Sequence, residues 1–350
     1  MGAGMRAWVG AWRGAPVRRT SGRVAGLVVL VALTVLLCLV SLAVGAKAVP
    51  LEHAIGALTA YDPALADHVI VRESRVPRTL AALLVGAALG LAGTVTQGLT
   101  RNPLADPGLL GVSAGASLAV VLGLHVVGFQ DPLGYVWFSL AGAAVTSVFV
   151  FLLGSSGPGG ASPMRLALAG AATTALLGSL TAAVLLLDSA SLDRYRFWAV
   201  GAVAGVRLST LADLLPLLAV GAVLAAGSGP LLNSLALGDD LAQGLGVQLG
   251  RSRALCATAV VLLVGTATAI AGPIAFVGLT VPHVARALVG ADHRWVLAYS
   301  AVLAAVLLIG SDVLGRMVAR PGEVQVGVVT AVVGAPFFIA LVRRRRLASA

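Results

Sequence analysis

The amino-acid sequence predicts an all-α polytopic membrane protein with about ten transmembrane helices and with both termini in the cytoplasm. Three observations predict this class. The 350 residues are 59% hydrophobic and only 11% charged, whereas soluble domains are about one-quarter charged. Apolar runs recur along the whole chain, and most approach the roughly 20 residues that a bilayer-spanning helix needs. They do not alternate in polarity as the strands of an outer-membrane barrel do.

Ten apolar segments, bounded by charges or by glycine and proline, define the predicted spans. They cover residues 24–46, 79–100, 108–126, 132–153, 166–187, 209–227, 252–271, 274–290, 295–313 and 324–342. Helices are expected because the bilayer offers no hydrogen-bond partner to an unpaired backbone group. The transmembrane region is therefore 24–342, between a basic tail at 1–23 and a second basic tail at 343–350. Gly272–Pro273 is interpreted as a tight turn between two helices.

The first span follows a basic stretch, as in a signal peptide. The apolar run 24–46 exceeds the 7–15 residues of a signal peptide's core, and no small-residue cleavage site follows, so a retained span is expected. Most lysines and arginines fall in segments that are cytoplasmic if the N-terminus is inside, which favours N-in and C-in. The same placement accounts for the net charge of +10 without a nucleic-acid partner.

The second and third spans contain small residues four positions apart. Gly86 and Gly90 lie in the second span, and Gly111 and Gly115 lie in the third. Such spacing lets helix backbones approach closely in lipid. Asp106 and the proline that follows it fit an N-cap and a first-turn proline for the third span. The residues alone therefore indicate a tightly packed helical hairpin.

Two connecting segments on the predicted cytoplasmic side could form short helices. In ALGDDLAQGLGVQLG, residues 236–250, Gly238 ends one helix and Asp239 or Asp240 can cap the next. In PHVARALVGADHR, residues 282–294, a proline bends or starts a helix, and Gly290 can adopt a left-handed C-cap. From the residues alone, the first segment could equally be a plain surface connector.

Metal binding is not expected in the second segment. His283 and His293 are ten positions apart, and no further histidine or cysteine lies near them in the sequence. A structural or subunit-facing role is expected for both.

Carboxylates within the predicted spans are scarce. Only Asp213 and Asp312 lie there, and both are near predicted external ends. An ion-coupled carrier would keep carboxylates near the midplane, so the sequence argues against one. The uncharged polar residues that could line a central path, or equally hold helices together, are Thr94, Thr96, Gln97, Ser113 and Ser117.

The sequence contains no phosphate-binding loop of the type that ATPases use. Its one lysine, Lys47, does not follow the glycine-rich pattern G-x-x-x-x-G-K-[ST]. If ATP drives the protein, another chain must hydrolyse it.

The amino-acid sequences of several segments resemble those of one protein family. NPLADPGLLGVSAGA, residues 102–116, is similar to the signature of FecCD-type permeases, the membrane subunits of binding-protein-dependent ABC importers for iron–siderophores, haem and vitamin B12. The likeness continues in RVPRT at 75–79, ALGDDLAQGLG at 236–246, GPIAFVGLTVPHVAR at 272–286, GADHR at 290–294 and GVVTAVVGAPFF at 327–338. These segments occur in the family's order and span nearly the whole chain.

The resemblance implies an importer permease for an iron–siderophore-type chelate, without catalysis or a bound cofactor, in a bacterial plasma membrane. It also implies a second permease chain, identical or paralogous, two cytoplasmic ATPase subunits that bind ATP and Mg²⁺, and an external substrate-binding protein. The alternatives are a permease for vitamin B12 or haem and an ion-coupled secondary transporter. An intramembrane enzyme would need a buried catalytic constellation, and the sequence indicates none.

The resemblance also assigns candidate site residues. Arg75, Arg78 and Arg316 would pair with acidic residues of the binding protein, although juxtamembrane arginines can simply mark span ends. The residues expected to couple to the ATPase are Asp239, Asp240, Leu241, Ala242, Gly244, Leu245 and Gly246 in the first loop, and Pro282, His283, Arg286, Asp292, His293 and Arg294 in the second. Asp239 stands where the family usually has glutamate, so the charge is kept.

Overall fold

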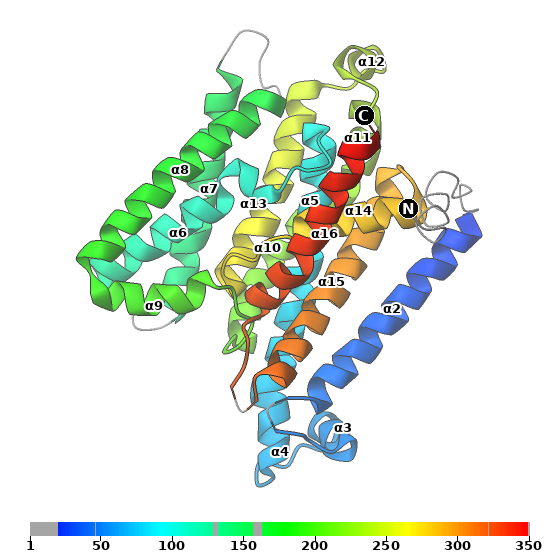
Figure 1. The fold of residues 1–350 in the computed structure, drawn as a ribbon. Coiled ribbons are helices and arrows are strands. Elements are labelled where there is room, and N and C mark those ends of the chain that lie inside the picture. Colours follow the sequence, from blue (N-terminus) through cyan, green and yellow to red (C-terminus); the bar gives the residue numbers. More distant parts are fainter. Residues whose placement is uncertain (1–19, 46, 129–131, 157–162, 321, 349–350) are drawn as a thin grey trace.

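The computed structural model describes residues 20–45, 47–128, 132–156, 163–320 and 322–348 (Figure 1). All regular secondary structure in these ranges is helical, and ten apolar helices match the ten predicted spans. This confirms the all-α polytopic class, while the cytoplasmic placement of the termini stays a prediction. They are α2 (Thr20–Ala43), α5 (Val76–Thr100), α6 (Val112–Leu122), α7 (Pro132–Ser155), α8 (Pro163–Leu187), α10 (Leu208–Gly227), α13 (Leu249–Ala271), α14 (Val277–Val289), α15 (His293–Val318) and α16 (Val326–Ala348). Seven of the described helices are long and apolar enough to cross a membrane, and three shorter apolar helices cover 112–127, 277–289 and 326–340.

Short helices lie at the two ends of the bundle. At one end are α3 (Leu51–Thr59), α4 (Ala66–Val69), the π-helix Ile70–Arg75 and α9 (Ser189–Ala199), and we name this end the α9 face. At the other end, the α12 face, are α11 (Gly229–Leu235) and α12 (Asp239–Gly244) (Figure 1). The last helix, α16, ends toward the α12 face, while the start of α2 contacts the start of α15 through a hydrogen bond from the Tyr299 hydroxyl to the Arg23 carbonyl.

The centre of the bundle is built from α5, α13, α14 and α15, and α2 and α8 lie at its periphery. In the most apolar 18-residue stretch of each helix, 78% of the residues are buried for α5 with the segment before it, against 11% for α2 and 17% for α8. Glycine makes this core compact. A Cβ on Gly90 would lie 2.2 Å from the Ser300 carbonyl of α15, and a Cβ on Gly93 would lie 2.0 Å from the Gly278 carbonyl of α14.

The predicted hairpin of the second and third spans is therefore corrected. The α5 glycines pack against α15 and α14, whereas Gly115 of α6 packs against α7, where an added Cβ would lie 2.4 Å from the Gly142 carbonyl. The spacing of small residues correctly indicated close helix packing. It could not show which helix would be the neighbour.

Three boundaries differ from the prediction in instructive ways. Asp106 caps a short 3₁₀ helix, Pro107–Leu110, and not the span itself, because Gly111 turns left-handed at φ +70° before α6 begins. Gly272, at φ +71°, ends α13 as expected, but α14 begins only at Val277. The last helix extends to Ala348, through most of the segment predicted as a tail.

Candidate functional site

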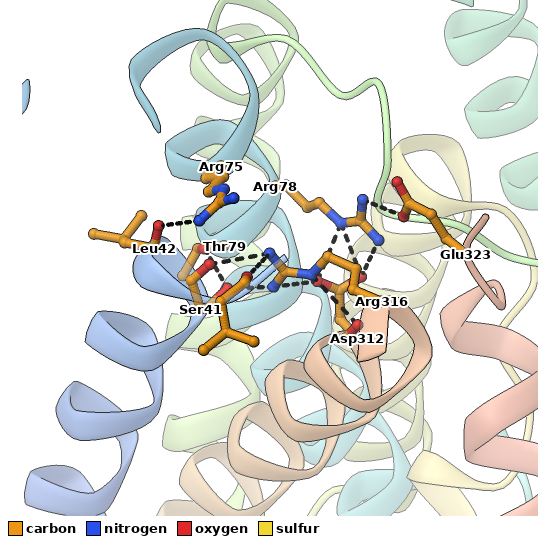
Figure 2. Close-up of polar contacts among 9 residues, drawn as sticks. Ser41, Leu42, Arg75, Arg78, Thr79, Asp312, Arg316 and Glu323 are labelled. Atoms are coloured by element: carbon orange, nitrogen blue, oxygen red, sulfur yellow. Dashed lines mark hydrogen bonds and ion pairs between the residues drawn. The ribbon is translucent and has the colours of Figure 1, made fainter. Parts of the chain in front are cut away.

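Three predicted site arginines cluster at the α9-face ends of α5 and α15 (Figure 2). Arg75, Arg78 and Arg316 are only 5%, 7% and 3% exposed. Asp312, 1% exposed, pairs with two of them. Its carboxylate accepts from Arg78 Nε at 2.9 Å and from Arg78 Nη2 at 2.8 Å, while Arg316 Nη2 lies 2.9 Å from the other oxygen. One buried carboxylate thus holds two guanidinium groups.

Two of these arginines, Arg75 and Arg316, bind the end of α2. Arg316 Nη1 donates to the carbonyls of Ser41 and Val44, each at 3.0 Å, and its Nη2 donates to the Ser41 hydroxyl at 2.6 Å. Arg75 donates to the Leu42 carbonyl at 2.7 Å. The last carbonyls of a helix have no partner within it, so these arginines act as the C-terminal cap of α2 and join it to α5 and α15.

The family resemblance assigns these arginines to contacts with a binding protein, whereas the structure places them in contacts within the chain. A buried guanidinium requires hydrogen-bond partners, and the chain supplies them. The cluster reaches the surface through Glu323, which is 39% exposed in its side chain and whose Oε2 lies 2.5 Å from Arg78 Nη1. Contact with a binding protein remains a prediction for these residues, and as placed here Arg75 and Arg316 offer almost no surface.

On the α12 face, α12 is fixed to the bundle by Asp239. Its carboxylate pairs with Arg253 Nη2 at 2.8 Å and also with Arg101, which lie at the start of α13 and at the end of α5. Partial burial raises the pKa of Asp239, but the two arginines lower it by a larger amount. Its pKa therefore lies below the ordinary value, and the group is ionised at neutral pH. The sequence predicted this residue as a possible cap, whereas the structure makes it an anchor.

The remaining residues of this first loop divide into an inner and an outer set. Ala242 is fully buried, whereas Leu241 and Leu245 are 63% and 67% exposed. Four positions apart, the two leucines share one face of the chain. Also exposed are Asp240, Gly244 and Gly246. An exposed leucine pair beside a bundle end is the kind of surface that a partner protein covers.

The second predicted coupling segment is more deeply engaged within the chain. His283 Nε2 lies 2.6 Å from the Pro103 carbonyl, and Arg286 donates to the Gln97 side chain. Pro282 is buried inside α14. Within this segment, the exposed positions are Leu288, Gly290, Ala291 and Arg294.

Asn233 of α11 organises the turn between α14 and α15. Its amide nitrogen donates to Asp292 at 2.8 Å, and its amide oxygen accepts from the His293 backbone N–H at 2.9 Å. Asp292 also caps α15 by accepting from the Arg294 N–H at 3.1 Å. Sequence reasoning missed Asn233, since nothing local marks an asparagine that binds a turn 59 residues later.

The predicted path residues separate into two groups. The threonines Thr94 and Thr96 are fully buried and donate to carbonyls of their own helix, and Gln97 donates to the Leu279 carbonyl of α14 at 3.0 Å. Gln97 therefore holds α5 against α14, as the alternative of interhelical contacts anticipated, whereas the hydrogen bonds of the two threonines stay within α5. Ser117 is half-buried. Ser113 lines a cavity of about 720 Å³.

Comparisons with known proteins define the class. The FecCD transport family matches residues 33–344. The ferric enterobactin transport system permease protein FepD of Escherichia coli (strain K12) is 47% identical over 317 residues, covering 90% of this chain and 94% of that protein. The iron(3+)-hydroxamate import system permease protein FhuB of Bacillus subtilis (strain 168) is 40% identical, covering 94% and 86%.

Solved structures agree with this assignment. An inward-facing metal-chelate type ABC transporter chain superimposes with a TM-score of 0.81 at 28% identity, covering 91% of this chain and 98% of that one. The protein is therefore a membrane-spanning permease of the ABC importer class and not an enzyme. It belongs to the FecCD transport family.

Proposed function

We propose that this chain imports a ferric-siderophore-type chelate across a bacterial plasma membrane. The observation that carries the proposal is the family match over residues 33–344 together with relatives named for ferric enterobactin, iron(3+)-hydroxamate and Fe(3+)-citrate. Haem is the second candidate cargo, because the hemin transport system permease protein HmuU of Yersinia pestis is 38% identical over 277 residues. Vitamin B12 stays open on the family resemblance alone.

We assign the orientation of the chain in the membrane from the partners that each end of the bundle would bind. The α12 face, with its exposed leucines and the basic C-terminal helix end, is assigned to the cytoplasm, in agreement with the bias of lysine and arginine. The α9 face is then external and meets the substrate-binding protein. A second permease chain, two ATPase subunits with ATP and Mg²⁺, and that binding protein complete the transporter.

The anchoring of α12 suggests how an ATPase could move this permease. A partner that binds Leu241 and Leu245 and moves would also displace Asp239, which lies two positions before the first leucine. Through its pairs with Arg101 and Arg253, Asp239 connects directly to the ends of α5 and α13, which lie in the core of the bundle. Closure of the ATPase pair would thus displace two central helices and not only a surface loop.

The cargo is tested by uptake. A strain lacking this gene is offered labelled ferric siderophores, haem and cobalamin in parallel. We expect the loss of uptake of one ferric siderophore, and recovery when the gene is restored. Loss of haem or cobalamin uptake would correct the cargo and keep the mechanism, whereas unchanged uptake of all three, with redundant systems removed, would contradict the importer proposal.

The docking surface is tested by the double variant Leu241→Asp/Leu245→Asp. Two carboxylates in place of exposed leucines would be desolvated without a partner in the interface, at a cost of several kcal/mol. We expect the variant to lose its ATPase subunits during purification while the permease itself is recovered in normal yield. Gln243→Asp, which adds charge to the same helix without removing an apolar side chain, is the control. Normal ATPase recovery with the double variant would exclude this surface.

A further inference from the structure

A cavity of about 360 Å³ lies beside the C-terminal end of α9. Its wall combines the end of α9, the loop that follows, the start of α10, the last turn of α13 and the residue before α16. None of the arginines of the buried cluster and none of the predicted path residues lines it. The cavity is therefore a separate feature from those already described.

The polar side chains around this cavity favour an anion. Arg194 of α9 and Arg207, the N-cap residue of α10, both line it, and the described lining residues include no aspartate or glutamate. Arg207 is exposed and forms no ion pair among the described residues. Guanidinium groups bind oxyanions through paired, charge-assisted hydrogen bonds. Phe197 and Trp198 add aromatic surface beside this charge.

Two buried polar atoms on the lining residues lack a partner. The indole Nε1 of Trp198, a donor, and the amide Oε1 of Gln325, an acceptor, have no hydrogen-bond partner within the described part of the chain. Leaving a buried polar group unsatisfied costs about 1–3 kcal/mol. In this structure both atoms are closed to solvent, so a bound group that offers an acceptor and a hydroxyl or amide donor would satisfy them only once the two side chains turn toward the cavity.

The cavity adjoins a close junction of three chain segments around Gly201, Gly272 and Gly327, which we name the glycine junction. The Ala202 N–H donates to the Ala271 carbonyl at 2.8 Å, and the Gly327 N–H donates to the Gly201 carbonyl at 3.0 Å. A Cβ added to Gly272 would lie 2.2 Å from the Trp198 carbonyl oxygen, and a Cβ added to Gly327 would lie 2.0 Å from the Val200 carbonyl oxygen. The backbones therefore touch without side chains between them.

The larger cavity, about 720 Å³ in volume, lies next along the same segments. Trp198 and Ala271 line the smaller cavity, whereas Ala199 and Pro273 line the larger one, together with Asp106 and Ser113. The glycine junction thus lies between the smaller and the larger cavity, both of which adjoin the segments at 198–199 and 271–273. A molecule held in the smaller cavity would rest on this junction.

We infer that the cavity beside α9 is a binding site for an oxyanion group of the cargo, which the permease holds on its external side before the glycine junction opens. This inference rests on the proposed import of a ferric chelate. Hard cations take oxygen ligands, and a ferric chelate whose ligands are carboxylates or catecholates carries a net negative charge at those oxygens, which the two arginines can bind. The volume suits one arm of a chelate, which makes this a transient contact.

The test uses the permease with its ATPase subunits in lipid nanodiscs, without binding protein, and the retention of iron-labelled ferric citrate as the probe. We expect Arg207→Glu to weaken retention about tenfold, the size of one charge-assisted contact, and Trp198→Phe to weaken it less. Arg320→Glu is the matched control, since Arg320 is an exposed arginine at the end of α15 that does not line the cavity. An uncharged ferric trihydroxamate should respond little to any of the three variants.

The outcomes separate the sources of the oxyanion. Phospholipid that co-purifies with the wild type but not with Arg207→Glu, with ferric citrate retention unchanged, would assign the cavity to a lipid headgroup and overturn the cargo assignment. Equal retention by Arg207→Glu and Arg320→Glu, without a lipid change, would overturn the oxyanion site altogether. Arg207→Gln, measured in parallel, guards against an effect of the introduced carboxylate on assembly. Failure of the wild-type gene to support cellular uptake would instead refute the proposed function.

Discussion

Replacing Asp312 with alanine should reduce the free energy of unfolding by about 3–5 kcal/mol, the usual effect of removing one member of a buried ion pair. Two guanidinium groups, Arg78 and Arg316, would lose the carboxylate that lies within 2.9 Å of each. Because both remain buried, water cannot fully replace it. The measurement is the fraction of detergent-solubilised protein that stays monodisperse on heating.

Glu323→Gln is the control for this variant, since Glu323 contacts the same Arg78 but is 39% exposed in its side chain. A pair that opens to solvent contributes about 0–1 kcal/mol, so the control should unfold close to the wild type. If the two variants lost equal stability, the cluster would be a surface network and its interpretation as the junction of α2, α5 and α15 would be wrong.

Gly93→Ala should disrupt the packing of α5 on α14 and give little folded protein. The added methyl group would lie 2.0 Å from the Gly278 carbonyl oxygen, which belongs to the backbone and cannot rotate away. Overpacking of a core costs about 1–3 kcal/mol and sometimes more, and here a whole helix must shift. The yield of folded permease after gel filtration measures the effect.

Two further alanine substitutions show whether the cause is this contact. Gly178 of α8 and Gly310 of α15 have no atoms within 4 Å of an added Cβ. Alanine favours a helix by up to about 1 kcal/mol over glycine, so Gly178→Ala and Gly310→Ala should retain or gain stability. A loss in these variants similar to that of Gly93→Ala would show that helical glycines matter here for flexibility and not for close approach.

The sequence was a good guide where the signal is local. Apolar length identified the ten spans, and Gly272 and Gly290, both at positive φ, lie where helices were expected to end. The sequence did not show whether a polar residue within a span packs between helices or lines a path. Both lipid and protein neighbours are apolar, so periodicity does not distinguish the buried Thr94 from a path-lining one.

Distance along the chain explains the other differences. Arg78 and Asp312 are 234 positions apart, and only the four-residue spacing of Asp312 and Arg316 hinted that an ion pair was present. The resemblance to a family predicted that the first coupling loop docks a partner, and its two leucines are exposed. The tether of Asp239 to Arg101 and Arg253 depends on helix ends that only the fold brings together.

The long sequence separation within the arginine cluster also bears on how the protein is made. Ribosomes extend a chain by about 5–20 residues per second, so Asp312 emerges roughly 10–50 s after Arg78. During that interval Arg78 at the start of α5 is without the Asp312 carboxylate. Its side chain must stay among lipid headgroups until α15 is inserted and draws it inward. Completion of the cluster would thus mark the moment at which a nascent permease turns from separate hairpins into one folded body.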